Sequence, residues 1–444
     1  MNPLSSEELG ELKGIFKHLI SIDTSNPPGN ETPAARYIAE LLSKDSIGSD
    51  LIESQLGRGN IVARIGKGGG RSLLFLGHLD VVPPGSRENW TRPPFGAIEQ
   101  EGRIYGRGAA DMKNMVAAQV FAFLKIAREN RRIDGTLILA ETADEENGGA
   151  KGIGYLVQNV PQLVKADYSV TEGGGLVVSG KGGRYIGYET GEKGIYWTKL
   201  LFQGTGGHAS VPYILDNPVV KAATAIQRIT HAMELRHSNE AALDHLRAAA
   251  KAYAIGNLNE DGSNYEELME RLRIVDEFSW SRIRAQAAVT ATPTMMSSGI
   301  RPNVAPPSAE ITIDCRVLPG VDKEEIKQWL LENAGTSCRV EEIAFSPSST
   351  STIDPTFEFA LTEALKAHAG ADGTFRYMLP AGTDSRYVRA LGAQAVGVEV
   401  YSPSVDMRDI DQRTHAPDEY IDIDSLKRMA EFYLDLIERL LGQV

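Results

Sequence analysis

The sequence predicts an α/β protein: a larger domain around a largely parallel sheet, with a smaller α+β domain inserted into it. Apolar, β-branched runs alternate with helical patterns in the first part of the chain. Near residue 192 the segment KGIYWTKLLFQG has the pattern of a new amphipathic strand, and a helix pattern follows it. Helical periodicity returns at Phe357 and closes the chain. The first domain is therefore predicted to be discontinuous.

Local patterns predict the individual elements. Ser5 stands three residues before Glu8, the spacing of a capping box, and apolar residues follow at helical intervals. A second helix is expected after the loop DTSNPPGNET. Strands are expected at 61–65, 73–76 and 136–140, and helices at 112–127, 323–332, 357–367 and 424–441.

These patterns set the expected domain boundaries. We expect the first, discontinuous domain to comprise 1–191 and 347–444, and the inserted domain to comprise 192–346. A polar, helix-prone insertion at about 232–290 lies within the second domain, where it would affect pocket size and oligomerisation geometry. We expect its histidines to lie on helix surfaces: His231, His237 and His245.

Composition excludes several classes of protein. The 444 residues suffice for two domains, and no uncharged apolar run approaches the roughly 20 residues that a membrane-spanning helix needs. A net charge of -13 argues against nucleic acid as a partner, because surfaces that bind phosphates are basic. Only two cysteines, Cys315 and Cys338, and an acidic N-terminal segment predict a cytoplasmic protein.

Polar side chains that could carry chemistry stand at the ends of predicted strands and in the turns between elements. They are His78 and Asp80, Asp111, the run Asp144 to Glu146, Glu172 and His415. Each has an ordinary explanation, as a strand-end pair, a helix N-cap or a solvated loop. Loops at the strand ends of an α/β sheet commonly meet at a ligand site, however, and consecutive acids behind a buried strand are explained if a cation neutralises them.

Five of these residues form a chemically consistent set. They offer nitrogen and oxygen ligands and no thiolate, a mixture that zinc accepts: His78, Asp111, Glu146, Glu172 and His415. Two ions with three protein ligands each need six ligand places, and five residues fill six places if one carboxylate bridges. The sequence therefore predicts a two-metal hydrolase.

The order of motifs resembles the zinc aminoacylase and carboxypeptidase family, which includes glutamate carboxypeptidase, succinyl-diaminopimelate desuccinylase and acetylornithine deacetylase. The resemblance covers nearly the whole chain. Its motifs are matched, in family order, by GHLDVVPPG, YGRGAADMK, ADEENGG, TEGGG, GTGGHASVP, RPNVAPPSAEITIDCRVLPG, AGTDSRY and THAPDEYI. The segments DTSNPPGNE, ENWTRPPFGA and IRAQAAVTATPTMMSSG look most like the carboxypeptidase S branch.

The resemblance implies a role for each ligand. Asp111 would bridge two Zn²⁺ ions, for which Co²⁺ or Mn²⁺ can substitute. His78 and Glu172 would complete one metal site, and Glu146 and His415 would complete the other.

The resemblance also implies the catalytic and substrate-binding groups. Glu145 would be the general base that assists attack by a metal-bound hydroxide, Asp80 would orient His78, and His208 would donate to the developing oxyanion. The residues expected to meet a small peptide or N-acyl amino acid with a free carboxylate are Arg316 and Asn303, beside the loop of Gly382, Thr383 and Asp384. The motif of Arg316 offers it no obvious acidic partner. The resemblance implies lids that pair in homodimers, so that His208 would serve the partner's metals. The alternative is that the helical insertion lets one chain close its own site, although the insertion is short for a whole second lid.

Two other functions are weighed against this one. The segment GLVVSGKG nearly spells a phosphate-binding loop, but it lacks the following Ser or Thr, and Val177 and Val178 suit a strand. A non-catalytic metal-binding protein on the same fold is the remaining alternative. Retention of Glu145 argues against it, because a structural zinc site has no use for an unligated base.

Overall fold

A mixed sheet forms the centre of the larger part of the molecule. The computed structural model describes residues 3–232, 234–236, 239–335 and 338–442, and within these ranges the sheet has ten strands. Its path is β1-β2-β6-β3-β7-β19-β9-β17, and β8 and β18 also pair with β9. The strands are β1 (Ser49–Glu53), β2 (Gly59–Gly66), β3 (Arg71–His78), β6 (Gly135–Thr142), β7 (Tyr168–Thr171), β8 (Val177–Gly180), β9 (Gly183–Glu192), β17 (Ser349–Thr350), β18 (Gly373–Leu379) and β19 (Gln394–Gly397).

The middle of this sheet is parallel. β3 runs parallel to β6 on one side and to β7 on the other, and β19 runs parallel to β7. The predicted α/β class is confirmed, and the strands expected at 61–65, 73–76 and 136–140 are present. The carboxyl ends of β3, β6 and β7 therefore meet at one edge of the sheet, where the strand-end polar residues follow.

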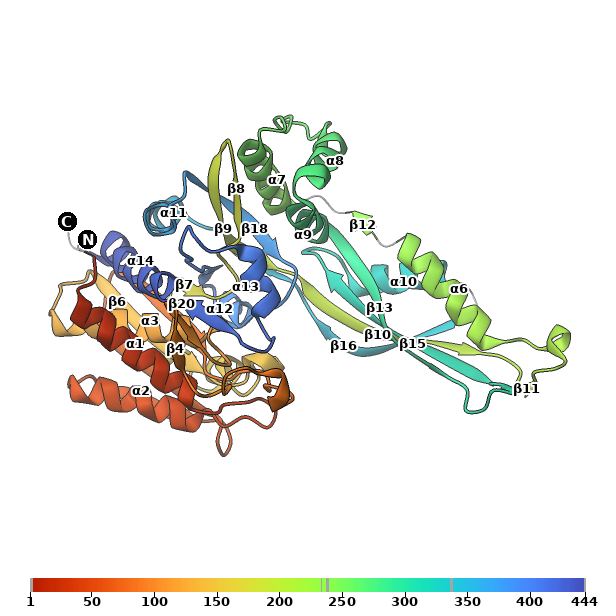
Figure 1. Cartoon of the computed structure of the whole chain (residues 1–444), viewed down its shortest axis with the longest axis horizontal. Helices are drawn as coiled ribbons and strands as arrows, with labels where there is room; N and C mark the ends of the chain where they lie inside the picture. Colours follow the sequence, from red (N-terminus) through yellow and green to blue (C-terminus); the bar gives the residue numbers. More distant parts are fainter. Residues whose placement is uncertain (1–2, 233, 237–238, 336–337, 443–444) are drawn as a thin grey trace.

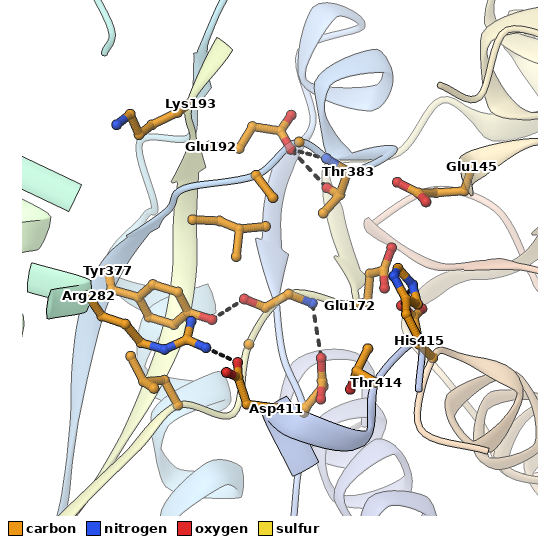
Figure 2. A pocket seen from close by; sticks show the side chains of 18 of the residues that line it. Glu145, Glu172, Glu192, Lys193, Arg282, Tyr377, Thr383, Asp411, Thr414 and His415 are labelled. Carbon is orange, nitrogen blue, oxygen red and sulfur yellow. Dashed lines mark hydrogen bonds and ion pairs between the residues drawn. The ribbon is translucent and has the colours of Figure 1, made fainter. Parts of the chain in front are cut away.

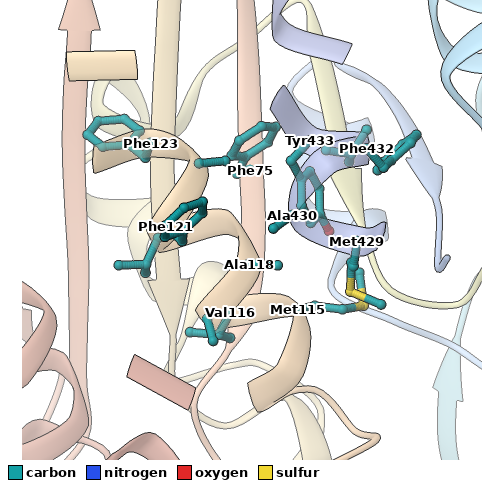
Figure 3. Packing of buried hydrophobic residues seen from close by; sticks show 14 of the residues in the cluster. Phe75, Met115, Val116, Ala118, Phe121, Phe123, Met429, Ala430, Phe432 and Tyr433 are labelled. Carbon is teal, nitrogen blue, oxygen red and sulfur yellow. The ribbon is translucent and has the colours of Figure 1, made fainter. Parts of the chain in front are cut away.

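Alternate residues of β3 supply two cores, as the two-residue period of a strand requires. Leu73 and Phe75 belong to the core under the long helices, whereas Leu74 and Leu76 belong to the core on the other face. Figure 3 shows Phe75 beside Tyr433, with ring centroids 4.8 Å apart. The long helices are α1 (Ser6–Ser21), α2 (Thr32–Lys44), α3 (Lys113–Arg128), α11 (Pro355–Ala369) and α14 (Ile423–Leu441), and the opposite face carries α4 (Ile153–Asn159), α5 (Pro161–Val164) and α12 (Ser385–Ala390).

The capping box predicted for the first helix is present. Ser5 Oγ accepts a hydrogen bond from the Glu8 backbone amide, and the Glu8 side chain accepts one from the Ser5 amide. These bonds satisfy two donors that the first helical turn leaves unpaired. No helix in the described part of the chain is both long and apolar enough to cross a membrane.

The segment after Glu192 forms an elongated arm (Figure 1). Its antiparallel sheet has the order β12-β13-β15-β10-β16, and α6 and α10 pack on that sheet. β11 and β14 pair near the end of the arm. The elements are β10 (Gly194–Gln203), β11 (Gly207–His208), α6 (Pro218–His231), β12 (Glu234–Arg236), β13 (Ala288–Ser298), β14 (Val304–Ala305), β15 (Ser308–Val317), α10 (Lys323–Ala334) and β16 (Cys338–Ser346).

The helical insertion packs on the large sheet although it lies within the sequence range of the arm. Its helices α7 (Glu240–Tyr253), α8 (Tyr265–Val275) and α9 (Glu277–Ala287) share a core with residues of β8, β9 and β18. Figure 1 shows them beside the upper ends of these strands. The insertion thus covers the large sheet next to the point where the arm begins.

The prediction that His245 lies on a helix surface is wrong. Its side chain is fully buried, and its ring stacks on Phe375 at 4.7 Å between centroids. Burial lowers the pKa of His245 to about 4, and Nδ1 lies 3.1 Å from Gln286 Oε1. A neutral imidazole fits this apolar setting because desolvation penalises the charged form. His231 is exposed as expected, and His237 lies outside the described residues.

Smaller elements complete the fold. β4 (Ile98–Gln100), β5 (Arg103–Tyr105) and β20 (Tyr420–Asp422) form a three-stranded sheet, and α13 (Met407–Arg413) precedes His415. Three short 3-10 turns are η1 (Arg87–Asn89), η2 (Glu145–Asn147) and η3 (Pro212–Ile214). The segment compared above with a phosphate-binding loop contains β8, which pairs with β9 as an ordinary strand.

Candidate metal centre and active site

The five predicted ligands come together at the carboxyl edge of the large sheet. His78 ends β3, Glu146 lies in the turn after β6, and Glu172 follows β7. Asp111 precedes α3 and His415 follows α13, so five separate segments contribute one side chain each. Ligand atoms of His78, Asp111 and Glu146 all lie within 4.8 Å of one another.

Asp111 lies at the centre of this cluster. Its Oδ1 is 3.0 Å from His78 Nε2, and its Oδ2 is 3.0 Å from His415 Nε2. Glu172 Oε1 lies 3.5 Å from the first of these nitrogens, and Glu146 Oε1 lies 3.3 Å from the second. The cluster therefore divides into two halves, each with one histidine and one glutamate, and Asp111 presents one oxygen to each half.

The shifted pKa values of the clustered side chains indicate a site for cations. Burial and the neighbouring Asp111 raise the pKa of Glu172 to about 8, and burial beside the same carboxylate raises the pKa of Glu146. Hydrogen bonds to Asp111 and Glu146 raise the pKa of His415 to about 10. Burial alone would lower the pKa of His78, but Glu172 and Asp111 raise it above its ordinary value. The histidines and carboxylates thus hold protons that bound metal ions would replace.

The donor set fits divalent metal ions. Glu146 Oε1 is buried and lies 3.3 Å from His415 Nε2, so these two potential ligand atoms face the same half of the cluster. Three carboxylates and two imidazoles are hard to intermediate ligands of the kind that zinc binds. The residues that would hold the ions are the five predicted ones: His78, Asp111, Glu146, Glu172 and His415.

Asp80 holds the cluster from behind. Its backbone oxygen lies 3.0 Å from His78 Nδ1, closer than its carboxylate, which is 3.5 Å away. The carboxylate accepts the backbone amides of Glu145 at 3.1 Å and Glu146 at 3.2 Å. The side chain therefore ties the end of β3 to the turn that carries both glutamates, and the histidine is oriented mainly by the backbone.

Sequence reasoning missed a buried network that supports this turn. Asn26 Nδ2 donates to Asp80 Oδ2 at 2.8 Å, and Arg58 Nη2 donates to Asp144 Oδ1 at 2.7 Å. Asp144 adopts φ 74°, a left-handed conformation, directly before Glu145. Arg58 is only 1% exposed and also pairs with buried Glu31. The segment DTSNPPGNE drew attention to the loop around Asn26, but no local signal connects Arg58 with Asp144.

A cavity of about 690 Å³ opens over the cluster. Glu145, Asp111, Glu172 and His415 line it on the sheet side, and Phe278 and Arg282 of the insertion line it on another side. Figure 2 shows Glu145 among these residues, with Tyr377 and Arg282 across the pocket from His415. Burial and the neighbouring Glu172 raise the pKa of Glu145 well above its ordinary value.

Arg316 lines the same cavity, but it has an acidic partner, contrary to the expectation from its motif. Its Nε donates to Asp314 Oδ1 at 2.8 Å, and its Nη2 donates to Asp314 Oδ2 at 3.1 Å. The two residues are two positions apart on β15, so their side chains point to the same face of the strand. A substrate carboxylate would have to share the guanidinium with Asp314.

The loop after β18 reaches the cavity through Gly382 and Thr383. Thr383 Oγ1 donates to Glu192 Oε2 at 3.0 Å, which fixes the loop to the end of β9. Asp384 is buried behind the cavity wall, where burial raises its pKa to about 7 and Thr142 Oγ1 lies 3.4 Å away. Two of the three loop residues thus face the cavity.

His208 and Asn303 do not join the cluster. They lie in and beside the short β11 and β14 pair near the end of the arm (Figure 1), and neither lines the cavity. Both are exposed, and His208 Nδ1 accepts a hydrogen bond from the Ser210 amide at 3.2 Å. In this arrangement one chain does not bring His208 to its own metal centre.

A sequence model of the peptidase family M20/M25/M40 matches residues 74–439. The chain belongs to this family. The family predicted from the motifs is thereby confirmed, and membership identifies a metallohydrolase of the M20 type.

Relatives and solved structures agree with this assignment. A probable succinyl-diaminopimelate desuccinylase of Staphylococcus aureus strain Mu50 is 28% identical over 319 residues, which span 71% of this chain and 70% of that protein. A protein of the same name from strain MRSA252 is 25% identical over 429 residues, 94% of this chain and 95% of that protein. The fold matches the M20 family metallo-carboxypeptidase Sso-CP2 of Sulfolobus solfataricus, with a TM-score of 0.73, 21% identity and coverage of 98% and 99% of the two chains.

Proposed function

We propose that this M20-family protein hydrolyses the amide bond next to a free carboxylate in small peptides or N-acyl amino acids. The observation that carries the proposal is the position of Asp111, whose two oxygens lie 3.0 Å from two different histidines. One carboxylate placed between two nitrogen and oxygen ligand sets is what a pair of metal ions needs. The names of the relatives, a desuccinylase and a metallo-carboxypeptidase, favour the same substrate class.

We assign five residues to two zinc ions. Asp111 would be shared, His78 and Glu172 would complete one site, and Glu146 and His415 would complete the other. When bound, such ions polarise the substrate carbonyl and lower the pKa of a water molecule. The all-nitrogen-and-oxygen donor set favours zinc and permits Co²⁺ or Mn²⁺.

Glu145 is the proposed general base. It lines the cavity beside the cluster, and its backbone amide is held by the Asp80 carboxylate. Its carboxylate would take a proton from the attacking water and return that proton to the leaving amide nitrogen. Asp80 acts as a positioning residue, since it fixes both Glu145 and Glu146 relative to the end of β3.

Groups around the cavity would orient the substrate. Arg316 offers a planar guanidinium to the substrate carboxylate, and Gly382 and Thr383 line the adjoining wall. Asn303 and His208 would complete the site from the end of a second chain's arm, where His208 would donate to the developing oxyanion. Asp384 would support the loop from behind.

The arm has features of a dimerisation surface. Large apolar side chains are exposed there, among them Tyr213 at 99% and Ile300 at 96%. The outer half of β13, with Met295 and Met296, pairs only with β15 among the described residues. An open strand edge with exposed apolar groups suits pairing with a second copy. We therefore propose a homodimer through the arm.

We also propose the domain boundaries. The catalytic domain would comprise 1–191 and 347–444, and the arm, with the helical insertion in its sequence range, would comprise 192–346.

Metal analysis combined with a substrate panel tests the proposed function. The purified protein should contain two metal ions per chain and hydrolyse a subset of dipeptides or N-acyl amino acids. Removal of the metal should abolish hydrolysis, and added Zn²⁺ should restore it. A protein that binds two ions but hydrolyses no member of a broad panel would instead be a non-catalytic metal-binding protein.

A further inference from the structure

The short helix α13 connects the helical insertion with the metal cluster. Met407 and Ile410 of α13 line the cavity, and His415 follows the helix by two residues. The Thr414 amide donates to the Ile410 oxygen at 2.9 Å, and the Ala416 amide donates to the Arg413 oxygen at 2.8 Å. The backbone from α13 to His415 is therefore continuous in its hydrogen bonding, so a shift of the helix moves the imidazole.

Two ion pairs join α13 to the insertion, and their charges are crossed. Arg282 of α9 pairs with Asp411 of α13 (Figure 2), whereas Arg408 of α13 pairs with Asp276 at the start of α9, at 3.0 Å. Each segment thus supplies one cation and one anion. A displacement of α13 along α9 would separate both pairs together.

The insertion side of this contact is well anchored. Asp276 is 5% exposed, accepts the Ser279 amide at 3.3 Å and receives the Tyr253 hydroxyl at 2.7 Å. It therefore joins α7, the start of α9 and α13. The Arg282 guanidinium also lies over the Phe278 ring, 4.7 Å from its centroid. On the other side of α13, the Asp409 carboxylate accepts a hydrogen bond from the Tyr420 hydroxyl, which connects the helix to β20. The same carboxylate also accepts one from Arg413 within α13.

We propose that the helical insertion positions His415 by holding α13 through these two crossed ion pairs. Figure 2 shows Arg282 across the pocket from His415, with Asp411 and Thr414 between them in the view and the Arg282–Asp411 ion pair marked. The inference rests on the proposed function, because it takes His415 and Glu146 as ligands of one ion. Arg282 and Arg408 are positioning residues, and their loss weakens that ion selectively.

The test compares metal retention in a set of variants of the full-length protein. Arg282→Gln combined with Arg408→Gln removes both pairs and keeps side-chain length. His415→Ala serves as the reference for complete loss of one ligand. Arg247→Gln is the matched control, because Arg247 pairs with Glu240 and Asp244 of its own helix, α7, and makes no ion pair with α13 among the described residues. Zinc content and graded chelator competition report on each ion, independently of turnover.

The expected result is a loss confined to one ion. The double variant should bind its weaker ion about 10- to 100-fold less tightly than the parent, as removal of groups that orient a ligand typically does. The affinity for the tighter ion, and the melting temperature of the chelator-treated protein, should be the same in the double variant as in the Arg247→Gln control. The charge exchange Arg282→Glu with Asp411→Arg restores one ion pair with reversed polarity. It should therefore bind the weaker ion with an affinity close to that of the parent.

Other results overturn the inference. If the double variant retains both ions like the parent, the two ion pairs are not needed to hold α13 in place. If both ions weaken together and the chelator-treated variant melts earlier, the pairs stabilise the fold and do not position His415. A charge exchange that recovers nothing rejects the ion-pair explanation. If the parent binds two ions and is active, and the variants bind both ions as tightly as the parent, the proposed role of the ion pairs is wrong but the proposed function is not. If the parent binds no second ion, the proposed function is wrong, and the proposed role of the ion pairs is wrong with it.

Discussion

The metal cluster and the tip of the arm differ in how far a single chain assembles them. Five predicted ligands from five segments meet at the edge of the large sheet, with Asp111 3.0 Å from two histidines. His208 and Asn303 are instead exposed near the end of the arm and do not line the cavity. Parallel strands force their carboxyl ends together, whereas nothing in the arm's own sheet brings its tip back to the cluster. The cluster is therefore a property of one chain, and the complete site is proposed to need two.

The largest expected effects come from the cluster itself. Asp111→Ala should lower metal content and activity together, because this residue faces both halves of the site. Glu145→Gln should leave two ions bound and lower kcat by about 10²- to 10⁴-fold, the usual contribution of a general base. Elemental analysis beside steady-state kinetics measures both. If Glu145→Gln loses metal as severely as Asp111→Ala, the division between ligand and base is incorrect.

The next prediction concerns the tip of the arm. His208→Ala should lower kcat by about 10²- to 10³-fold, as the loss of one oxyanion donor does. Inactive His208→Ala chains mixed with inactive Glu145→Gln chains should recover about a quarter of wild-type activity after subunit exchange, because half of the dimers are mixed and each has one intact site. Labelled chains verify that exchange occurs. Verified exchange without recovered activity would place His208 outside the partner's site.

Substrate recognition should show a smaller effect. Amidation of the substrate carboxylate should lower kcat/KM by about 10- to 100-fold, which corresponds to the roughly 1.5–3 kcal/mol of a charged hydrogen bond. The bidentate contact of Arg316 with Asp314 limits this effect, since the guanidinium is already paired. In Arg316→Ala the preference for the free acid should largely disappear. Equal kcat/KM for both substrates in the wild type would remove Arg316 from the carboxylate site.

The smallest expected effect is a pH dependence of the metal-free protein. Folding raises the pKa of Glu172 from 4.5 to about 8 and that of His415 from 6.5 to about 10, so in the native state Glu172 holds an extra proton from about pH 4.5 to 8 and His415 from about pH 6.5 to 10. The contribution of these two groups to the free energy of unfolding should therefore fall as pH rises from 5 to 8, by at most about 1.4 kcal/mol per pH unit for each proton. Denaturant unfolding of chelator-treated protein at pH 5, 7 and 8 measures the slope.

Bound metal should remove most of this dependence. Metal ions replace the protons of the cluster, and their affinity increases with pH because the ligands bind in deprotonated form. His208→Ala offers the control, since His208 is exposed at the other end of the arm and should leave the slope unchanged. A metal-free protein that becomes more stable from pH 5 to 8 would contradict the electrostatic account of the cluster.

The sequence by itself determined the α/β class, the family and the residue types at the strand ends. These features depend on local signals: short apolar, β-branched runs, a capping box at Ser5, and polar residues directly after buried strands. Because β3, β6 and β7 are parallel neighbours, such residues had to gather at one edge. The proximity of His78, Glu146 and Glu172 could therefore be anticipated without coordinates.

Only the tertiary structure decided the contacts between distant segments. It buried His245 against Phe375 and directed the Asp80 carboxylate to the amides of the Glu145 turn. It also placed the helical insertion on the large sheet, where Arg282 reaches Asp411. Local periodicity shows that a helix has an apolar face but does not identify the surface that covers it. That choice depends on packing between segments more than a hundred residues apart, which no local pattern encodes.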